Sequence, residues 1–299
     1  MDRTAPIVLP ADVRSRLKAL RLLPRRAHGA QGIGQHASRS RGAGLEFAQY
    51  RAYEPGDELR QVDWKLYARS DRFFVRESER ESPVTVWILI DASASAGQCD
   101  QARAGYTRLD HACAVAACVA ELALQQGDRF GLIAVGGQGV QLVPAGHGLR
   151  QRDRVHLQLR QLVAAGTWPP SEALRPLWER VRAGDMLLAL GDGFDAAGIT
   201  VLERLAAARR DVTHLQLLSA DERDFPFTDG HRFRDPETGQ ELLGDGPALR
   251  EEYLQQFAQA QRALQARLQT AGIAHATAWM DEPADAALQR LSAGRGGAA

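Results

Sequence analysis

Apolar and polar positions along this chain follow two kinds of pattern, and from residue 84 onward segments of one kind alternate with segments of the other. Short apolar runs rich in β-branched residues are typical of strands buried on both faces. Longer stretches with apolar residues every three or four positions are typical of helices. The expected strands are 84–90, 129–135, 138–143, 185–190, 212–218 and 273–279. The expected helices are 107–126, 149–163, 171–182, 199–210 and 248–270. This alternation predicts an α/β fold with a doubly wound, mostly parallel sheet and helices on both faces.

Two segments depart from the alternation. Residues 220–246 contain the turn sequence DPETG at 235–239 between two short extended runs, which predicts a β-hairpin insertion. Such an insertion either carries specificity or is a tolerated loop, and the sequence leaves both readings open. Near the N-terminus, residues 10–22 have the apolar spacing of a short basic amphipathic helix. Packing on its own domain is the favoured interpretation of this helix, with contact to a membrane surface as the alternative.

These patterns divide the chain into four parts. They are a basic N-terminal arm and loop (1–40), a segment packed on the main domain (41–82), the main domain with its hairpin insertion 220–246 (83–292), and a flexible tail (293–299). The arm holds eight Lys and Arg against two Asp. In the second part, Pro55-Gly56-Asp57 indicates a turn, after which Asp57 is expected to cap a short helix running toward Arg69.

Composition narrows the class of protein. The chain is 44% hydrophobic and 25% charged with no formal net charge, which is typical of a globular protein and gives no overall attraction to nucleic acid. Three cysteines are too few for a disulfide framework, so we expect reduced thiols. No run approaches the roughly 18 apolar residues of a membrane span, and the N-terminus lacks the apolar core of a signal peptide. We therefore expect a cytoplasmic protein, with peripheral association with the inner membrane as the alternative.

Oxygen-bearing side chains follow the central expected strands. Asp91 ends the first strand, and Ser93 and Ser95 follow it at alternate positions. Thr167 lies in a loop after Gly166, and Asp192 follows the strand 185–190. Because the carboxyl ends of parallel strands share one edge of a sheet, these groups should converge there. Hard oxygen donors of this kind suit Mg²⁺ or Mn²⁺, while Asp and Ser in a plain capping loop are the simpler interpretation.

This order of residues resembles the metal-ion-dependent adhesion site of von Willebrand factor A domains. The resemblance implies a von Willebrand factor A-like, Rossmann-like fold in which Asp91, Ser93, Ser95, Thr167 and Asp192 are the five ligating positions. It also implies Mg²⁺, Mn²⁺ or Ca²⁺ as the cofactor. In that family, an acidic residue of a partner protein completes the coordination of the metal.

The segment before the first strand resembles a more specific group. The matching motifs are Gly42-x-Gly44-x-Glu46-Phe47, Arg51-x-Tyr53-x-Pro55-Gly56-Asp57, Arg60-x-Val62-Asp63-Trp64, Ala68-Arg69 and Val75-Arg76-Glu77. They resemble the bacterial family of unknown function numbered fifty-eight, whose members are encoded beside MoxR-type AAA+ ATPases. The resemblance covers most of residues 40–280 and departs from the usual loop at Ala96, where many members carry Met. It implies a MoxR-type ATPase, or a protein client of that ATPase, as the partner.

The charged residues of this segment have two interpretations. They alternate in sign at Arg51, Asp57, Arg60, Asp63, Lys65 and Arg69. A network of surface ion pairs that holds the segment to the main domain is one interpretation. The other is a docking face for the partner, formed by Asp57, Arg60, Asp63 and Arg69 with Tyr53 and Trp64 as aromatic anchors.

The sequence favours a binding module over an enzyme. It lacks the phosphate-binding loop of ATPases, the paired His or Cys of zinc sites and the Gly-x-Ser-x-Gly nucleophile elbow. The alternative function is a metal-dependent phosphohydrolase that uses Asp91 as its nucleophile, although the residue two positions on is Ser93 rather than a second Asp. The family resemblance implies that this binding module is a chaperone-like adaptor in the assembly or activation of other proteins.

Overall fold

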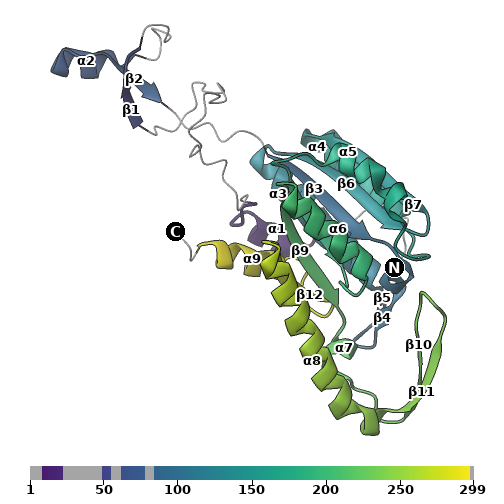
Figure 1. Ribbon diagram of the computed structural model, residues 1–299. Coiled ribbons are helices and arrows are strands. Elements are labelled where there is room, and N and C mark those ends of the chain that lie inside the picture. Colours follow the sequence, from purple (N-terminus) through teal and green to yellow (C-terminus); the bar gives the residue numbers. More distant parts are fainter. Residues whose placement is uncertain (1–8, 23–48, 55–61, 78–83, 297–299) are drawn as a thin grey trace. The chain divides into compact units, whose positions relative to one another are not determined.

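The computed structural model describes residues 9–22, 49–54, 62–77 and 84–296 of the chain (Figure 1). The chain divides into two compact units. The main unit is Met1–Ala27 with Val84–Ala299, and the second unit is His28–Pro83. Within the residues that the structure describes, no helix is long and apolar enough to cross a lipid bilayer.

A six-stranded sheet forms the centre of the main unit. Its strands are β3 (Thr85–Asp91), β6 (Arg129–Gly136), β7 (Gly139–Gly146), β8 (Met186–Gly191), β9 (Asp211–Leu218) and β12 (Ala274–Trp279). Their order across the sheet is β12-β9-β8-β3-β6-β7. All neighbouring pairs are parallel except β6 and β7. Counted along the chain, this is the order 3-2-1-4-5-6 of a doubly wound fold, as predicted.

The strands form because both of their faces are covered. Along β3, Val86, Ile88 and Ile90 face one hydrophobic core, whereas Trp87 and Leu89 face the other. All five side chains are buried. A strand in this position has no solvent-facing side, which explains the continuous apolar run in the sequence.

Helices pack on both faces of the sheet. The first core includes residues of α1 (Ala11–Leu17), α3 (Arg108–Gln126), α4 (Gly148–Gln161) and α9 (Ala286–Gly296). The second core includes residues of α5 (Arg175–Arg180), α6 (Ala196–Ala207) and the C-terminal part of α8 (Gly246–Thr270). The central helix α3 begins with a capping box, in which Thr107 and Asp110 satisfy each other's backbone N–H groups. This cap fixes the position of Arg108, the first residue of the helix.

The two ends of the chain differ in part from expectation. The basic helix α1 packs on its own unit through Val13 and Leu17, which are buried against the first core. At the other end, α9 continues to Gly296, so the expected flexible tail 293–299 begins with helical residues.

In the second unit, the structure describes a small antiparallel sheet and a helix within residues 49–54 and 62–77. Its elements are β1 (Gln49–Ala52), β2 (Phe74–Glu77) and α2 (Trp64–Ser70). The helix begins at Trp64, capped by Asp63, which accepts hydrogen bonds from the backbone N–H groups of Lys65 and Leu66. The prediction that Asp57 caps this helix was therefore wrong, and Asp57 itself lies outside the described residues.

Two hairpins and two short helical elements are attached to the carboxyl edge of the main sheet. After β3 come a 3-10 turn η2 (Ala94–Gly97) and the hairpin β4 (Cys99–Asp100) and β5 (Arg103–Thr107), which the sequence patterns did not indicate. The expected insertion consists of α7 (Ala220–Asp224) and the hairpin β10 (Gly230–Arg234) and β11 (Glu241–Asp245). Figure 1 shows the first half of α8 extending beyond the strand ends, beside this hairpin.

The outermost strand β7 is irregular. Its register with β6 shifts between Phe130 and Leu132. Within β7, Pro144 has no backbone N–H, so the row of hydrogen-bond donors along the strand is interrupted there. The side chain of Gln151, from α4, donates to the carbonyl oxygens of both Phe130 and Pro144 at 2.8 Å. The irregular end of this edge strand is therefore held by a helix side chain.

Candidate functional site

The candidate site lies where the order of strands in the sheet reverses. The strands β3 and β8 are neighbours, and the chain leaves them in opposite directions: β3 is followed in the sheet by β6 on one side, and β8 by β9 on the other. A ligand-binding crevice is expected beyond the carboxyl ends of two such strands. Asp91 is the last residue of β3, and Asp192 directly follows β8. The doubly wound topology thus brings these two acids to the same edge, as the sequence predicted.

The loop after β3 gathers three oxygen donors. The Asp91 Oδ1 accepts a hydrogen bond from the Ser93 backbone N–H at 2.9 Å. The hydroxyls of Ser93 and Ser95 lie 3.0 Å apart and hydrogen bond to each other. Ser93 is buried, and Asp91 and Ser95 are half-buried. A turn with this geometry presents a carboxylate and two hydroxyls side by side.

The loop that carries Thr167 is held against this turn by its backbone. The Ala94 N–H donates to the carbonyl of Gly166 at 2.8 Å, and the Ala165 N–H donates to the carbonyl of Ala92 at 3.0 Å. Gly137, after β6, donates to the carbonyl of Ala165 at 2.6 Å. A Cβ at Gly137 would lie 2.7 Å from that oxygen, so only glycine permits the close approach. Thr167 is exposed and follows Gly166 directly, which places it next to the loop of Asp91.

Asp192 is buried and forms an ion pair with the guanidinium of Arg108. Its Oδ2 accepts a hydrogen bond from the Arg108 guanidinium at 2.8 Å, and its Oδ1 accepts from the backbone N–H of Phe194 at 3.0 Å. The same guanidinium reaches Glu222 at 2.6 Å and the carbonyl of Ser95 at 3.2 Å. Each Asp192 oxygen retains a second lone pair. Asp192 can therefore act on a metal through that lone pair or through a metal-bound water.

Asp91 is held in a less favourable electrostatic environment. The pKa of its carboxyl is raised to about 6, mainly because burial removes the carboxylate from water. The backbone hydrogen bond from Ser93 opposes this shift, while the negative charges of Asp192 and Glu237 add to it. A bound cation would relieve these repulsions, because it would neutralise the carboxylate that burial destabilises.

These side chains fit a divalent cation with hard, oxygen-preferring chemistry. Two carboxylates and three hydroxyls are the donor types that Mg²⁺ and Mn²⁺ accept, and so few protein charges would leave such a cation partly hydrated. Gly191 keeps room for the Asp91 carboxylate, since a Cβ there would lie 3.0 Å from the Cβ of Asp91. Among the described residues, no three or more His, Cys, Asp or Glu side chains are grouped to hold a metal ion. Hydroxyls would therefore have to supply part of the coordination.

Sequence reasoning missed two residues around the site, Arg108 and Glu222. The fold brings them together at this edge, where Arg108 reaches the Ser95 carbonyl, Asp192 and Glu222. Of these residues, Arg108 could have been noticed in the sequence. It lies four positions before Ala112, which places a charged residue on the apolar face of α3. A buried guanidinium there requires acidic partners, and they are Asp192 and Glu222.

The predicted docking residues lie in the second unit. Tyr53, Trp64, Tyr67 and Phe73 form an aromatic cluster in which the Tyr67 and Phe73 rings stack at 4.3 Å. Trp64 is 57% exposed and Phe73 is 45% exposed. Asp63 caps α2, and Arg69 is exposed on it. Asp57 and Arg60 lie outside the described residues.

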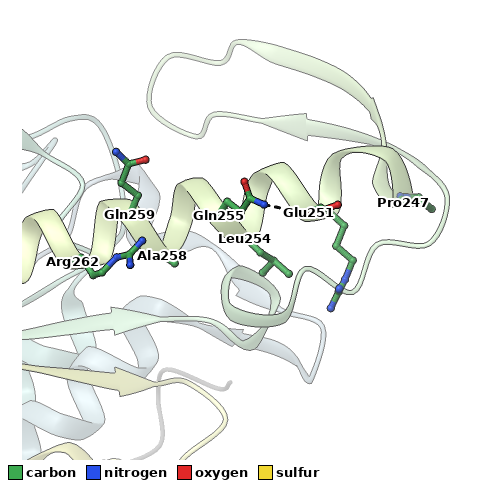
Figure 2. A pocket seen from close by; sticks show the side chains of 8 residues that line it. Pro247, Glu251, Leu254, Gln255, Ala258, Gln259 and Arg262 are labelled. Atoms are coloured by element: carbon green, nitrogen blue, oxygen red, sulfur yellow. Dashed lines mark hydrogen bonds between the residues drawn. The ribbon is translucent and has the colours of Figure 1, made fainter.

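A separate hollow on the surface runs along the first half of α8 (Figure 2). It is lined by Pro247, Arg250, Glu251, Leu254, Gln255, Ala258, Gln259 and Arg262. Glu251 pairs with Gln255, and Arg250 donates to the carbonyl of Asp224. All lining residues come from a single helix, so this hollow is an open groove with no converging catalytic groups.

The chain resembles several known proteins. Residues 49–263 match the model of the family described as "Protein of unknown function DUF58". The uncharacterized proteins Rv1480 of Mycobacterium tuberculosis and Mb1516 of Mycobacterium bovis are each 29% identical to the chain over 228 residues. The match covers 74% of this chain and 70% of each relative.

Two solved structures are similar at lower identity. The conserved hypothetical protein BatB from Bacteroides thetaiotaomicron is 14% identical, covering 72% of this chain and 98% of that chain, with a TM-score of 0.42. The VWA domain of SpRpn10 is 13% identical, covering 70% of this chain and 94% of that domain, with a TM-score of 0.36. Since both scores are below 0.5, the fold assignment rests on the order and direction of the strands.

Proposed function

The chain belongs to the family described as protein of unknown function DUF58, and we propose that it is a metal-dependent protein-binding module. The observation that carries the proposal is the turn after β3, where the Asp91 carboxylate and the hydroxyls of Ser93 and Ser95 lie side by side at the switch point of a doubly wound sheet. In this proposal Asp91, Ser93, Ser95, Thr167 and Asp192 hold Mg²⁺ or Mn²⁺, directly or through water. A carboxylate of a partner protein takes the remaining coordination position.

The nature of the partner follows from the family resemblance. We propose a MoxR-type AAA+ ATPase, or a protein that this ATPase remodels, with the chain as the adaptor between them. The aromatic cluster around Trp64 supports a second point of contact, because exposed aromatic side chains beside basic residues are typical of binding hot spots.

A phosphohydrolase is the less favoured function. A phosphoaspartate mechanism needs an acid that protonates the leaving group, and the residue two positions after Asp91 is a serine whose hydroxyl is bonded to Ser95. The guanidinium of Arg108, which reaches the Ser95 carbonyl at 3.2 Å, cannot act as a general acid at neutral pH. We therefore expect no turnover of p-nitrophenyl phosphate above the level of Asp91→Ala.

A calorimetric titration with Mg²⁺ and Mn²⁺ tests the metal site. The wild-type chain is compared with Asp91→Ala and with Asp153→Ala, which removes the same charge from an exposed position on α4. We expect saturable binding in the wild type and in Asp153→Ala, and none in Asp91→Ala, with all three folded by circular dichroism. Absence of binding in the wild type, or binding that survives in Asp91→Ala, would overturn the proposal.

Copurification tests the partner. A MoxR-type ATPase should be retained by the wild-type chain in Mg²⁺ and released by EDTA or by Asp91→Ala. Retention that does not depend on the metal would assign the contact to another surface and remove the role of the metal.

A further inference from the structure

One side of the helix α4 faces solvent. The buried side is formed by Gln151, Val155 and Leu159, which recur every four residues, and the helix packs on β6 and β7. On the outer side, residues 149, 150, 153, 154 and 157 are exposed. Residues three or four positions apart are neighbours on a helix, so these positions form one continuous surface.

This outer surface carries two large apolar side chains that the core leaves exposed. Leu149 is 59% exposed and Leu157 is 49% exposed. They are eight residues apart, which separates them by about 12 Å along the helix axis. Arg150 and Arg154 lie on the same outer side. Each leucine is therefore a separate apolar point on a basic surface.

The helix α4 has a large excess of positive charge. It holds four arginines against one acid, Asp153. Asp153 pairs with Arg152 at 2.9 Å, so a charge of the same helix neutralises it. Arg150 and Arg154 are exposed and, within the described parts of the chain, pair with no carboxylate. Since the whole chain has no formal net charge, this excess makes one side of the main unit positive.

The helix α1 adds positive charge to the same layer. Both α1 and α4 pack on the first core and contact α3. The helix α4 covers the β6–β7 end of the sheet, whereas Arg16 of α1 pairs at 2.6 Å with Asp285, next to α9, which packs on β12. The two basic helices therefore flank α3. Arg14 and Lys18 are exposed on α1, and its acid Asp12 pairs with Arg16.

We propose that α4, together with α1, docks the main unit on an anionic membrane surface. Leu149 and Leu157 enter the head-group layer. Arg150 and Arg154 bind lipid phosphates beside them, because a long arginine side chain can reach a phosphate while its apolar stem stays next to a leucine. The helix α1 adds electrostatic attraction without insertion, because its apolar side is buried in the first core.

The placement of the leucines favours a lipid surface over an acidic protein. The core of a protein interface gathers its apolar side chains in one packed patch. Here the two leucines are two helical turns apart, with arginines on the same side. Such isolated side chains can each leave water in a layer of lipid head groups, where no shaped pocket is needed.

Sedimentation of the full chain with lipid vesicles tests the proposal. Mixed vesicles of phosphatidylglycerol and phosphatidylcholine are compared with vesicles of phosphatidylcholine alone. We expect the wild type to bind only the mixed vesicles, and to bind them more weakly as the salt concentration rises. Arg150→Gln combined with Arg154→Gln should bind about 30-fold more weakly, since each cation near an anionic surface contributes about fivefold. Leu149→Ser combined with Leu157→Ser should bind at least about tenfold more weakly, since the inserted apolar area is lost.

Matched controls make the same changes elsewhere on the main unit. Arg204→Gln combined with Arg262→Gln removes two exposed arginines from α6 and α8, which pack on the opposite face of the sheet. Leu242→Ser combined with Leu243→Ser removes two exposed leucines from β11. Both control variants should bind the mixed vesicles like the wild type, and circular dichroism should show that all four variants are folded.

Three outcomes would overturn the proposal. One is that the wild type does not bind the mixed vesicles, or that the control variants weaken binding as much as the α4 variants. Another is that the arginine pair weakens binding and the leucine pair does not, because the helix would then not enter the lipid. The third is that soluble polyglutamate retains the wild type while vesicles do not, which would assign this surface to an acidic protein.

Discussion

Replacing Arg108 with methionine gives a direct measure of the charge balance at the sheet edge. The Arg108 side chain is 3% exposed and bridges two acids, Asp192 at 2.8 Å and Glu222 at 2.6 Å. Methionine retains most of the apolar stem, so the change removes the charge and its hydrogen bonds with little effect on packing. Asp192, with a side chain 5% exposed, would be left buried without its cation.

The expected loss follows from this burial. Removing one partner of a buried ion pair costs about 3–5 kcal/mol, because the other charge stays buried and uncompensated. Glu222 is 19% exposed and water can partly take over its pairing, so we expect the lower end of this range, about 3 kcal/mol. With a urea m-value of about 2 kcal/mol/M, the midpoint of unfolding should fall by about 1–2 M.

Urea unfolding followed by circular dichroism, without divalent metal, measures this loss. The matched control is Arg175→Met, in which an Arg 81% exposed loses its exposed partner Glu179. Such a surface pair contributes at most about 0.5 kcal/mol. Equal midpoints for Arg108→Met and Arg175→Met would refute the reasoning that Asp192 depends on Arg108. Added Mg²⁺ should stabilise Arg108→Met more than the wild type, since it supplies the missing positive charge.

Three further predictions address the site and the second unit. Burial raises the pKa of Asp91 to about 6, so between about pH 4 and 6 the folded state holds a proton that the unfolded state has already released. The free energy of unfolding of the metal-free protein should therefore fall as the pH rises through this window. The loss should reach about 3 kcal/mol, at about 1.36 kcal/mol per unit of pKa difference. Unfolding midpoints of Asp91→Asn should show no such loss over this window. Gly137→Ala should lower the free energy of unfolding by about 1–3 kcal/mol and should also weaken Mn²⁺ binding, because its Cβ would displace the backbone of Ala165 and Gly166, just before Thr167. Gly230→Ala, whose Cβ would meet open space, should change neither quantity. Trp64→Ala should weaken copurification of the MoxR-type ATPase while the urea midpoint of unfolding stays unchanged, since Trp64 is largely exposed. A lower midpoint with unchanged copurification would favour a structural role for Trp64.

The main sheet was predictable because burial on both faces leaves a strong trace in the sequence. The apolar runs of β3, β8 and β9 and the periodicity of α3 identified the alternation, from which the parallel sheet follows. The hairpin β4–β5 left no such trace, because its two strands are short and most of its residues are exposed. The helix α9 is rich in Ala and Gly and has little apolar periodicity, so its extent could not be predicted.

Long-range contacts decided the features that local patterns could not. The cap of α2 is Asp63 rather than Asp57, next to Val62, which forms a long-range β-bridge with Val75 that no local pattern indicates. The positions of Asp91 and Asp192 at one edge followed from topology alone. The pairing of Arg108 with Glu222 did not, since Glu222 lies on α7, in the insertion that follows β9.

The irregular edge strand β7 has a consequence for behaviour at high concentration. A free sheet edge is a template on which a second molecule can add a strand and begin fibril growth. Here Pro144 has no N–H to offer, and the carbonyl oxygens of Pro144 and Ala145 already accept from Gln151 and Arg129. The stretch Pro144–Ala145 is therefore a poor template for an incoming strand. The same residues that complete the sheet on this side thus also disfavour strand addition at this part of the edge.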